Sequence, residues 1–224
     1  LPLSFELTVF ALFLALLIGI PLGIIGAVKK NPILDIVIRI TGLLGLSLPQ
    51  FWLASLMVIA FSSFRGFIPM GNYIPFIQAP LENIRMMLLP SLAIGIGLAA
   101  VIMRYMRNSM LEVMQMDYIR TAQAKGLKRK IVISRHALKN AILPVITIAG
   151  FNTGYLLGGA IVIEEVFALP GMGRLVLYAI YQRDYPLIQG IVLIIALMFV
   201  LINLLTDLLY AAIDPRIRLD QKET

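Results

Sequence analysis

The sequence of 224 residues contains no cysteine, and only 14% of its residues are charged. Without cysteine there is no disulfide bond, no thiolate metal site and no thiol redox chemistry. A soluble domain of this length carries about 25% charged and about 45–50% apolar residues, whereas this chain is 60% hydrophobic. The apolar excess excludes an ordinary water-soluble fold and suits a protein that is surrounded by lipid.

Histidine is also scarce, because His136 is the only one in the chain. A single histidine without cysteine cannot complete the ligand set of a metal ion, so a polar residue on a helix is the favoured interpretation. The chain has no His-Glu-x-x-His or Gly-x-Ser-x-Gly motif, and no Gly-x-x-x-x-Gly-Lys-Ser/Thr phosphate loop. We therefore predict that the chain is not an enzyme and that it holds no cofactor or metal of its own.

Uncharged runs that are long enough to cross a bilayer dominate the chain. They are Leu7 to Val28, Ile40 to Phe64, Met86 to Met103, Asn140 to Ile163 and Tyr185 to Thr206. About 20 residues of helix cross the apolar part of a membrane, and a helix satisfies its own backbone hydrogen bonds there. The sequence predicts an all-α, polytopic transmembrane helical bundle with five spans, forming a single domain over residues 1–224. The stretch from Gly66 to Leu81 is short and proline-rich, so we expect a loop there.

Glycine and proline interrupt several of these runs. The first run contains Gly19, Pro21 and Gly23, and the second contains Pro49. Small residues let helices approach closely, and this is the favoured interpretation. The alternative is that such breaks form hinges, or backbone that lines a pathway.

The net charge of +7 would suggest a nucleic-acid partner in a soluble protein. Here the basic residues lie between apolar runs, where membrane topology explains them. If the first run ends in the cytoplasm, 15 of the 19 lysine and arginine residues fall on that side, and only Arg65, Arg85, Arg174 and Arg183 fall outside. The positive-inside rule then predicts a multi-pass protein of the inner (cytoplasmic) membrane with a cytoplasmic C-terminus and no nucleic-acid partner.

The longest predicted cytoplasmic segment, residues 104–139, holds nine basic and two acidic residues. Asp117 is a good N-cap and Gly126 a good C′ residue for a helix of about two turns. So short a helix needs a surface to pack on, and the small residues Ala122 and Ala124 would let one come close. Anionic lipid is one possible surface, but the capped helix favours a protein partner.

A second helix of this segment is expected to start near Lys128 and to lead into the fourth run. Pro144 lies where that run begins, and proline is a common cause of helix kinks. We therefore expect a kink there.

The segment Asp117-Tyr118-Ile119-Arg120-Thr121-Ala122-Gln123-Ala124-Lys125-Gly126 resembles the coupling loop of permease subunits of binding-protein-dependent ABC importers. Ala122 and Gly126 keep the spacing of the general Glu-Ala-Ala motif of these permeases. Arg120 and Thr121 depart from it, in the Arg-Thr-Ala-x-Ala-Lys-Gly form that is typical of the dipeptide, oligopeptide and nickel branch.

The resemblance extends over nearly the whole chain. It includes Arg135 to Ala141 with the following Leu143-Pro144, Glu165 to Arg174, Arg183 to Pro186, and Asp207 to Arg216. Members of the family usually have six spans, so the first helix of the family is expected to be absent from this chain.

The resemblance implies a transport subunit that forms half of a translocation path for peptides and works by alternating access. Its partners would be a second, related permease, two cytoplasmic ATPase subunits that bind ATP and Mg²⁺, and an extracytoplasmic substrate-binding protein. The residues implied in ATPase coupling are Asp117, Tyr118, Arg120, Thr121, Ala122, Lys125, Gly126 and Leu127. The alternative is a channel or structural membrane subunit with no ATPase partner.

Three polar residues of the fourth run and its outer end remain open to two interpretations. Asn152 either bonds neighbouring helices together or lines the path. Glu164 and Glu165 either only terminate an apolar run or contact the binding protein.

Overall fold

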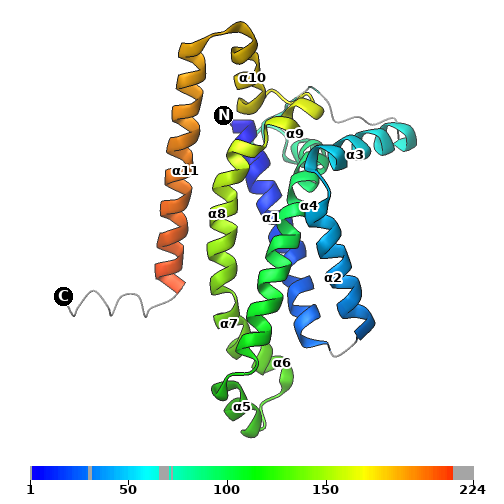
Figure 1. Cartoon of the computed structure of the whole chain (residues 1–224), viewed down its shortest axis with the longest axis vertical. Helices are drawn as coiled ribbons and strands as arrows, with labels where there is room; N and C mark the ends of the chain where they lie inside the picture. The colour runs from blue at the N-terminus through cyan, green and yellow to red at the C-terminus, as the bar shows by residue number, and fades with distance from the viewer. Residues whose placement is uncertain (1, 30–31, 66–70, 72, 214–224) are drawn as a thin grey trace, which may run out of the picture.

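The computed structural model describes residues 2–29, 32–65, 71 and 73–213, and this part of the chain contains helices and no β-strand (Figure 1). The longer helices are α1 (Pro2–Val28), α2 (Pro32–Ser47), α3 (Gln50–Arg65), α4 (Pro80–Val113), α8 (Leu143–Gly159) and α11 (Tyr185–Ile213). The shorter ones are α5 (Asp117–Ala124), α6 (Arg129–Ile131), the π-helix η1 (Val132–Ala137), α7 (Leu138–Ala141), α9 (Ile161–Val166) and α10 (Met172–Gln182). The all-α prediction is confirmed.

The apolar runs form membrane-spanning helices. In the described residues, α1, α4 and the part of α11 from Tyr185 to Thr206 are each long and apolar enough to cross a bilayer. Two bent pairs of helices raise the number of candidate spans from 3 to 5 if each pair is one span. The structure is therefore a polytopic helical bundle, as the sequence predicted.

The second apolar run differs from the expectation of one continuous span over Ile40 to Phe64. α2 ends at Ser47 and α3 begins at Gln50, with an angle of 99° between the two helices. Pro49 lies in the break. Proline has no N–H to donate, and its ring disfavours a helical conformation of the residue before it. The run is therefore a sharply bent pair of helices.

The third apolar run is the middle of a much longer helix. α4 has 34 residues, or about 50 Å of helix, whereas the apolar core of a bilayer is about 30 Å thick. Residues 104–113 continue this helix beyond the apolar run. The first part of the predicted connecting segment 104–139 is therefore helical and extends the bundle.

The chain bends by 47° at the start of the fourth apolar run, between Arg129–Ala141 and Leu143–Gly154. Pro144 is in the first turn of α8, so the kink expected there is confirmed. The second helix of the connecting segment begins at Arg129, next to the predicted Lys128, and includes the π-helical turns of η1, which the sequence did not predict.

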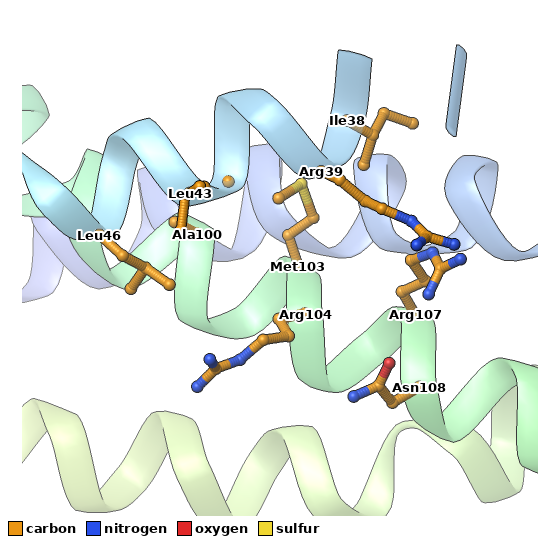
Figure 2. Close-up of a pocket in the computed structure, with 10 residues that line it drawn as sticks. Ile38, Arg39, Leu43, Leu46, Ala100, Met103, Arg104, Arg107 and Asn108 are labelled. Carbon is orange, nitrogen blue, oxygen red and sulfur yellow. The ribbon is translucent and has the colours of Figure 1, made fainter. Parts of the chain in front are cut away.

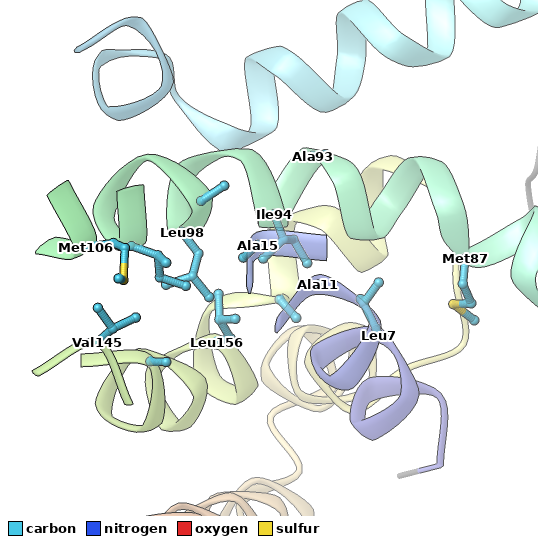
Figure 3. Close-up of a cluster of buried hydrophobic side chains, with 14 of the residues drawn as sticks. Leu7, Ala11, Ala15, Met87, Ala93, Ile94, Leu98, Met106, Val145 and Leu156 are labelled. Carbon is cyan, nitrogen blue, oxygen red and sulfur yellow. The ribbon is translucent and has the colours of Figure 1, made fainter. Parts of the chain in front are cut away.

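The main core lies between α1, α4 and α8, and α4 is central to it. Figure 3 shows Leu7, Ala11 and Ala15 of α1 facing Ile94 and Leu98 of α4. The same buried cluster continues to Phe167 and Leu169 at one end and to Ile119 at the other. It therefore joins both ends of the bundle through one packed interior.

Glycines allow α1 and α4 to approach closely. A Cβ atom on Gly19 would lie 2.7 Å from the carbonyl oxygen of Ala99, and one on Gly23 would lie 2.7 Å from Cβ of Met106. Neither position has room for a side chain. The packing interpretation of these glycines is thus the one that the structure supports.

α11 stands at the side of the bundle and packs on α8 (Figure 1). Most of its side chains are exposed, including Leu193, Leu197, Val200 and Leu204. A large apolar exposed surface suits contact with lipid or another membrane subunit. Residues 73–79 form the expected loop before α4, whereas residues 66–70 and 72 of that loop and the motif Asp214-Pro215-Arg216 lie outside the described residues.

Candidate functional site

The short helix that the sequence predicts in the connecting segment is present as α5. It lies at one end of the bundle, beyond the C-terminal end of α4, and it contacts η1 (Figure 1). The helix has 8 residues and therefore depends on the surface beneath it for its stability.

The C-terminal end of α5 is a Schellman motif. The N–H of Gly126 donates to the carbonyl of Gln123 (2.9 Å), and the N–H of Leu127 donates to the carbonyl of Ala122 (3.4 Å). Gly126 has a φ of +76°, in the left-handed region where glycine is unstrained. The role predicted for Gly126 as C′ residue is confirmed.

The N-terminal end of α5 differs from the prediction by one residue. Met116 is the N-cap and makes no side-chain cap, while Asp117 is the first helical residue. The Asp117 carboxylate lies 3.4 Å from the Arg120 guanidinium, and both side chains are largely exposed. An acidic residue in the first turn still interacts favourably with the helix dipole, so Asp117 stabilises the helix without capping it.

α5 has one buried face and one exposed face. Ile119 and Ala122 are buried against the same chain. Of the residues implied in coupling, Asp117, Tyr118, Arg120, Thr121, Lys125, Gly126 and Leu127 are all exposed. Ala122 packs closely against its own chain, and its role in ATPase coupling stays a prediction. Ala124, its small neighbour, is the exposed alanine.

Tyr118 links α5 to the base of the fourth span. The Asn140 Nδ2 donates a hydrogen bond of 2.7 Å to the Tyr118 hydroxyl. Both residues line an open cavity of about 720 Å³ that also reaches Glu112, Pro144 and Thr147. The hydrogen bond therefore connects α5 directly to the start of the fourth span.

α6 is tied to the first span at the same end of the bundle. The Arg129 guanidinium donates a hydrogen bond of 2.6 Å to the carbonyl of Val28, the last residue of α1. Unpaired carbonyls at the end of a helix favour a cationic donor of this kind. The segment that carries α5 is therefore attached to both α1 and the fourth span.

Asn152 lies within α8 and is partly buried. Its Nδ2 donates 2.8 Å to the carbonyl of Ile148 in the same helix. This bond uses the side-chain nitrogen of Asn152 and not its side-chain oxygen. Its role as a path-lining residue stays a prediction.

Glu164 and Glu165, at the other end of the bundle, have different environments. Glu164 is completely buried and accepts hydrogen bonds from the Ser4 hydroxyl (2.6 Å) and the Arg174 N–H (3.1 Å). Glu165 is half-exposed and lies 3.3 Å from the Arg174 guanidinium. Only Glu165 is accessible to a partner here, and contact with a binding protein stays a prediction.

The buried Glu164 network was not foreseen from the sequence. The Ser4 hydroxyl also accepts a 2.9 Å hydrogen bond from the N–H of Met172, so α1, α9 and α10 meet at one carboxylate. Burial raises the pKa of the Glu164 carboxyl, and the bonds from Ser4 and from the Arg174 backbone partly offset that effect. Nothing local in the sequence joins residues that are 160 positions apart.

Acidic and histidine side chains do not gather in threes anywhere in the described part of the chain, so no metal-binding group is found there. His136 lies in η1 and is partly exposed.

The fold is that of ABC importer permeases. A solved inward-facing conformation of the MetNI methionine ABC transporter superposes with a TM-score of 0.77, covering 94% of this chain and 93% of that one at 17% sequence identity. At this identity the likeness shows the fold alone.

Sequence comparison assigns the family. Residues 19–219 match the model of the family described as "binding-protein-dependent transport system inner membrane component", and the chain belongs to that family. A protein of Brucella abortus named as a peptide transport system permease is 42% identical over 98% of this chain and 70% of its own length. The dipeptide transport system permease protein DppB of Alkalihalophilus pseudofirmus is 43% identical over 96% of this chain and 71% of its own. The chain is therefore a permease subunit of a binding-protein-dependent ABC importer with peptide-type relatives, in an inner membrane.

Proposed function

We propose that this chain forms half of a translocation path for di- or oligopeptides and that α5 couples it to a cytoplasmic ATPase. The observation that carries the proposal is the construction of α5. One face is buried in the chain's own core, the opposite face is exposed, and Tyr118 connects it to the fourth span through Asn140. A helix fixed on one side and free on the other is suited to transmit a partner's movement.

Other subunits complete the transporter in this proposal. The sequence has no phosphate-binding loop, so ATP and Mg²⁺ are bound by two partner ATPase subunits. The second half of the path comes from a related permease, and the exposed apolar faces of α2 and α11 offer surface for it and for lipid. Peptide is the proposed substrate because two relatives with 42% and 43% identity are named as peptide and dipeptide transport permeases.

The proposed orientation places α5 in the cytoplasm and the Glu164 network outside. The positive-inside rule supports it, because the lysine and arginine residues concentrate at the α5 end. The C-terminus is then cytoplasmic as well. In this orientation Glu165 lies at the outer end, where a substrate-binding protein would dock.

The test introduces a charged side chain on the exposed face of α5. Ala124→Arg adds a bulky cation there without disturbing the core, whereas Ala122→Arg would disrupt buried packing and could not separate coupling from folding. Gln78→Arg is the matched control, because it adds the same charge to an exposed loop before α4. The permease is expressed with its ATPase and purified through a tag on the permease.

The ATPase is expected to co-purify with the wild type and with Gln78→Arg, and to be lost with Ala124→Arg. Peptide uptake should fall in parallel with ATPase binding. Unchanged ATPase binding in Ala124→Arg would show that the exposed face of α5 is not the coupling surface.

A further inference from the structure

A pocket between α2 and α4 combines an apolar wall with a cluster of arginines (Figure 2). Its volume is about 220 Å³. In Figure 2, Leu43, Leu46 and Ala100 lie toward one end of the pocket, while Arg39 and Arg107 lie together toward the other. None of these residues belongs to α5 or to the Glu164 network.

The polar end of the pocket carries more positive than negative charge. Asp35 accepts ion pairs from Arg39 (2.7 Å) and from Arg107 (2.9 Å), so one carboxylate serves two guanidinium groups. Arg104 also lines the pocket, but Figure 2 shows its guanidinium turned away from Arg39 and Arg107, toward the apolar end. Its guanidinium carbon lies 5.9 Å from the centre of the Tyr105 ring. The polar end therefore holds two guanidinium groups and one carboxylate.

Two arginines of the pocket lie at the boundaries of the apolar runs. Arg104 directly follows the apolar run that ends at Met103, and Arg39 directly precedes the run that begins at Ile40. Arginine at such a boundary sits at the level of lipid headgroups. The apolar wall is open to the surroundings, since the Leu43 and Leu46 side chains are 65% and 40% exposed. A ligand with a negative head and an apolar tail fits both ends.

We propose that this pocket binds an anionic phospholipid. The phosphate is held by Arg39 and Arg107, and one acyl chain lies along Leu43 and Leu46. Basic pockets between membrane helices suit anionic headgroups, because each arginine near the surface contributes about 1 kcal/mol of attraction. The lipid bridges α2 and α4. This inference depends on membrane insertion and not on the coupling role of α5.

The experiment measures which lipid the protein retains. The full chain is purified, incubated with equimolar dioleoylphosphatidylglycerol and dioleoylphosphatidylcholine, and analysed by native mass spectrometry. We expect the wild type to retain phosphatidylglycerol preferentially. Arg39→Gln should lower that retention about fivefold, and Arg39→Lys should keep most of it. The matched control is Arg135→Gln, which removes an exposed arginine of η1 outside the pocket and should change nothing.

A variant that is expected to bind more lipid distinguishes a lost binding site from a misfolded protein. Asp35→Asn frees both of its arginine partners for phosphate and should raise phosphatidylglycerol retention, which a damaged protein would not do. Equal retention of the two lipids by the wild type would overturn the proposal. So would unchanged retention in Arg39→Gln, a fall in Asp35→Asn, or displacement of the lipid by excess inorganic phosphate or by a soluble dipeptide.

Discussion

Asn140 donates a 2.7 Å hydrogen bond to the hydroxyl of Tyr118, across 22 residues of chain. Tyr118 is in α5 and Asn140 is in α7, immediately before the bend that leads into α8. The bond is exposed, so it contributes little to global stability. The hydrogen bond is a direct polar connection between the exposed face of α5 and the fourth span.

Removing that hydroxyl should weaken coupling more than folding. Tyr118→Phe keeps the ring and loses the acceptor, which costs about 1 kcal/mol and shifts a two-state equilibrium about fivefold. Peptide uptake into proteoliposomes should fall severalfold while the ATPase still co-purifies. Asn140→Ala should do the same, and the double variant should be no worse than either single one. Additive losses would show that the two residues act separately.

The left-handed conformation of Gly126 predicts a purely backbone effect. Nothing lies within 4 Å of a Cβ atom built on Gly126, so Gly126→Ala costs only the strain of a positive φ, about 1 kcal/mol. Gly71 has a φ of +85° and equally open surroundings, which makes Gly71→Ala a control with the same strain elsewhere. Uptake should fall with Gly126→Ala and not with Gly71→Ala. Equal uptake by the two variants would show that coupling does not depend on the left-handed turn at Gly126.

The close approach of α1 and α4 predicts that Gly19→Ala and Gly23→Ala both destabilise the bundle. The added methyl groups would meet backbone or buried side chains, and overpacking of this kind costs about 1–3 kcal/mol. Gly190→Ala on α11, where nothing lies within 4 Å, should not lower stability. Thermal unfolding followed by helical circular dichroism checks this, and a lower midpoint for Gly190→Ala would contradict the packing argument.

The buried Glu164 predicts a stability that depends on pH. Because burial raises its pKa in the folded protein, its contribution is fully present below the pKa of the unfolded chain and is lost as pH rises through the folded pKa. The wild type should therefore unfold at a higher temperature in mildly acidic than in alkaline buffer. Glu164→Gln should lose this slope.

Glu164→Gln should also destabilise the α9 end of the bundle in mildly acidic buffer, where the wild type is most stable. The carboxylate accepts from Ser4 and from the Arg174 N–H, and an amide must turn an N–H toward one of these donors, which costs about 1–3 kcal/mol. Glu165→Gln is the control, since its side chain is half-exposed. A smaller loss for Glu164→Gln than for Glu165→Gln would contradict the network.

Local physics made part of this structure predictable. Uncharged runs of about 20 residues indicate spanning helices, which satisfy their own backbone hydrogen bonds in lipid, and the helix end at Gly126 depends on the conformation of one residue. Tertiary contacts decided the rest. The burial of Ala122 depends on which side of α5 meets its own chain, and the position of Glu164 depends on Ser4 of the first helix. Pro49 marked a break in the second run, but not its angle of 99°.

The buried cluster that runs from Leu169 to Ile119 makes the bundle mechanically continuous. A close-packed interior has low compressibility and transmits strain. A push on the exposed face of α5 bears on Ile119 and so on that interior, and little of it can be absorbed by local yielding. The helices around α4 should then turn as one stiff body, so under the proposed coupling role a force applied at α5 would open the opposite end of the bundle.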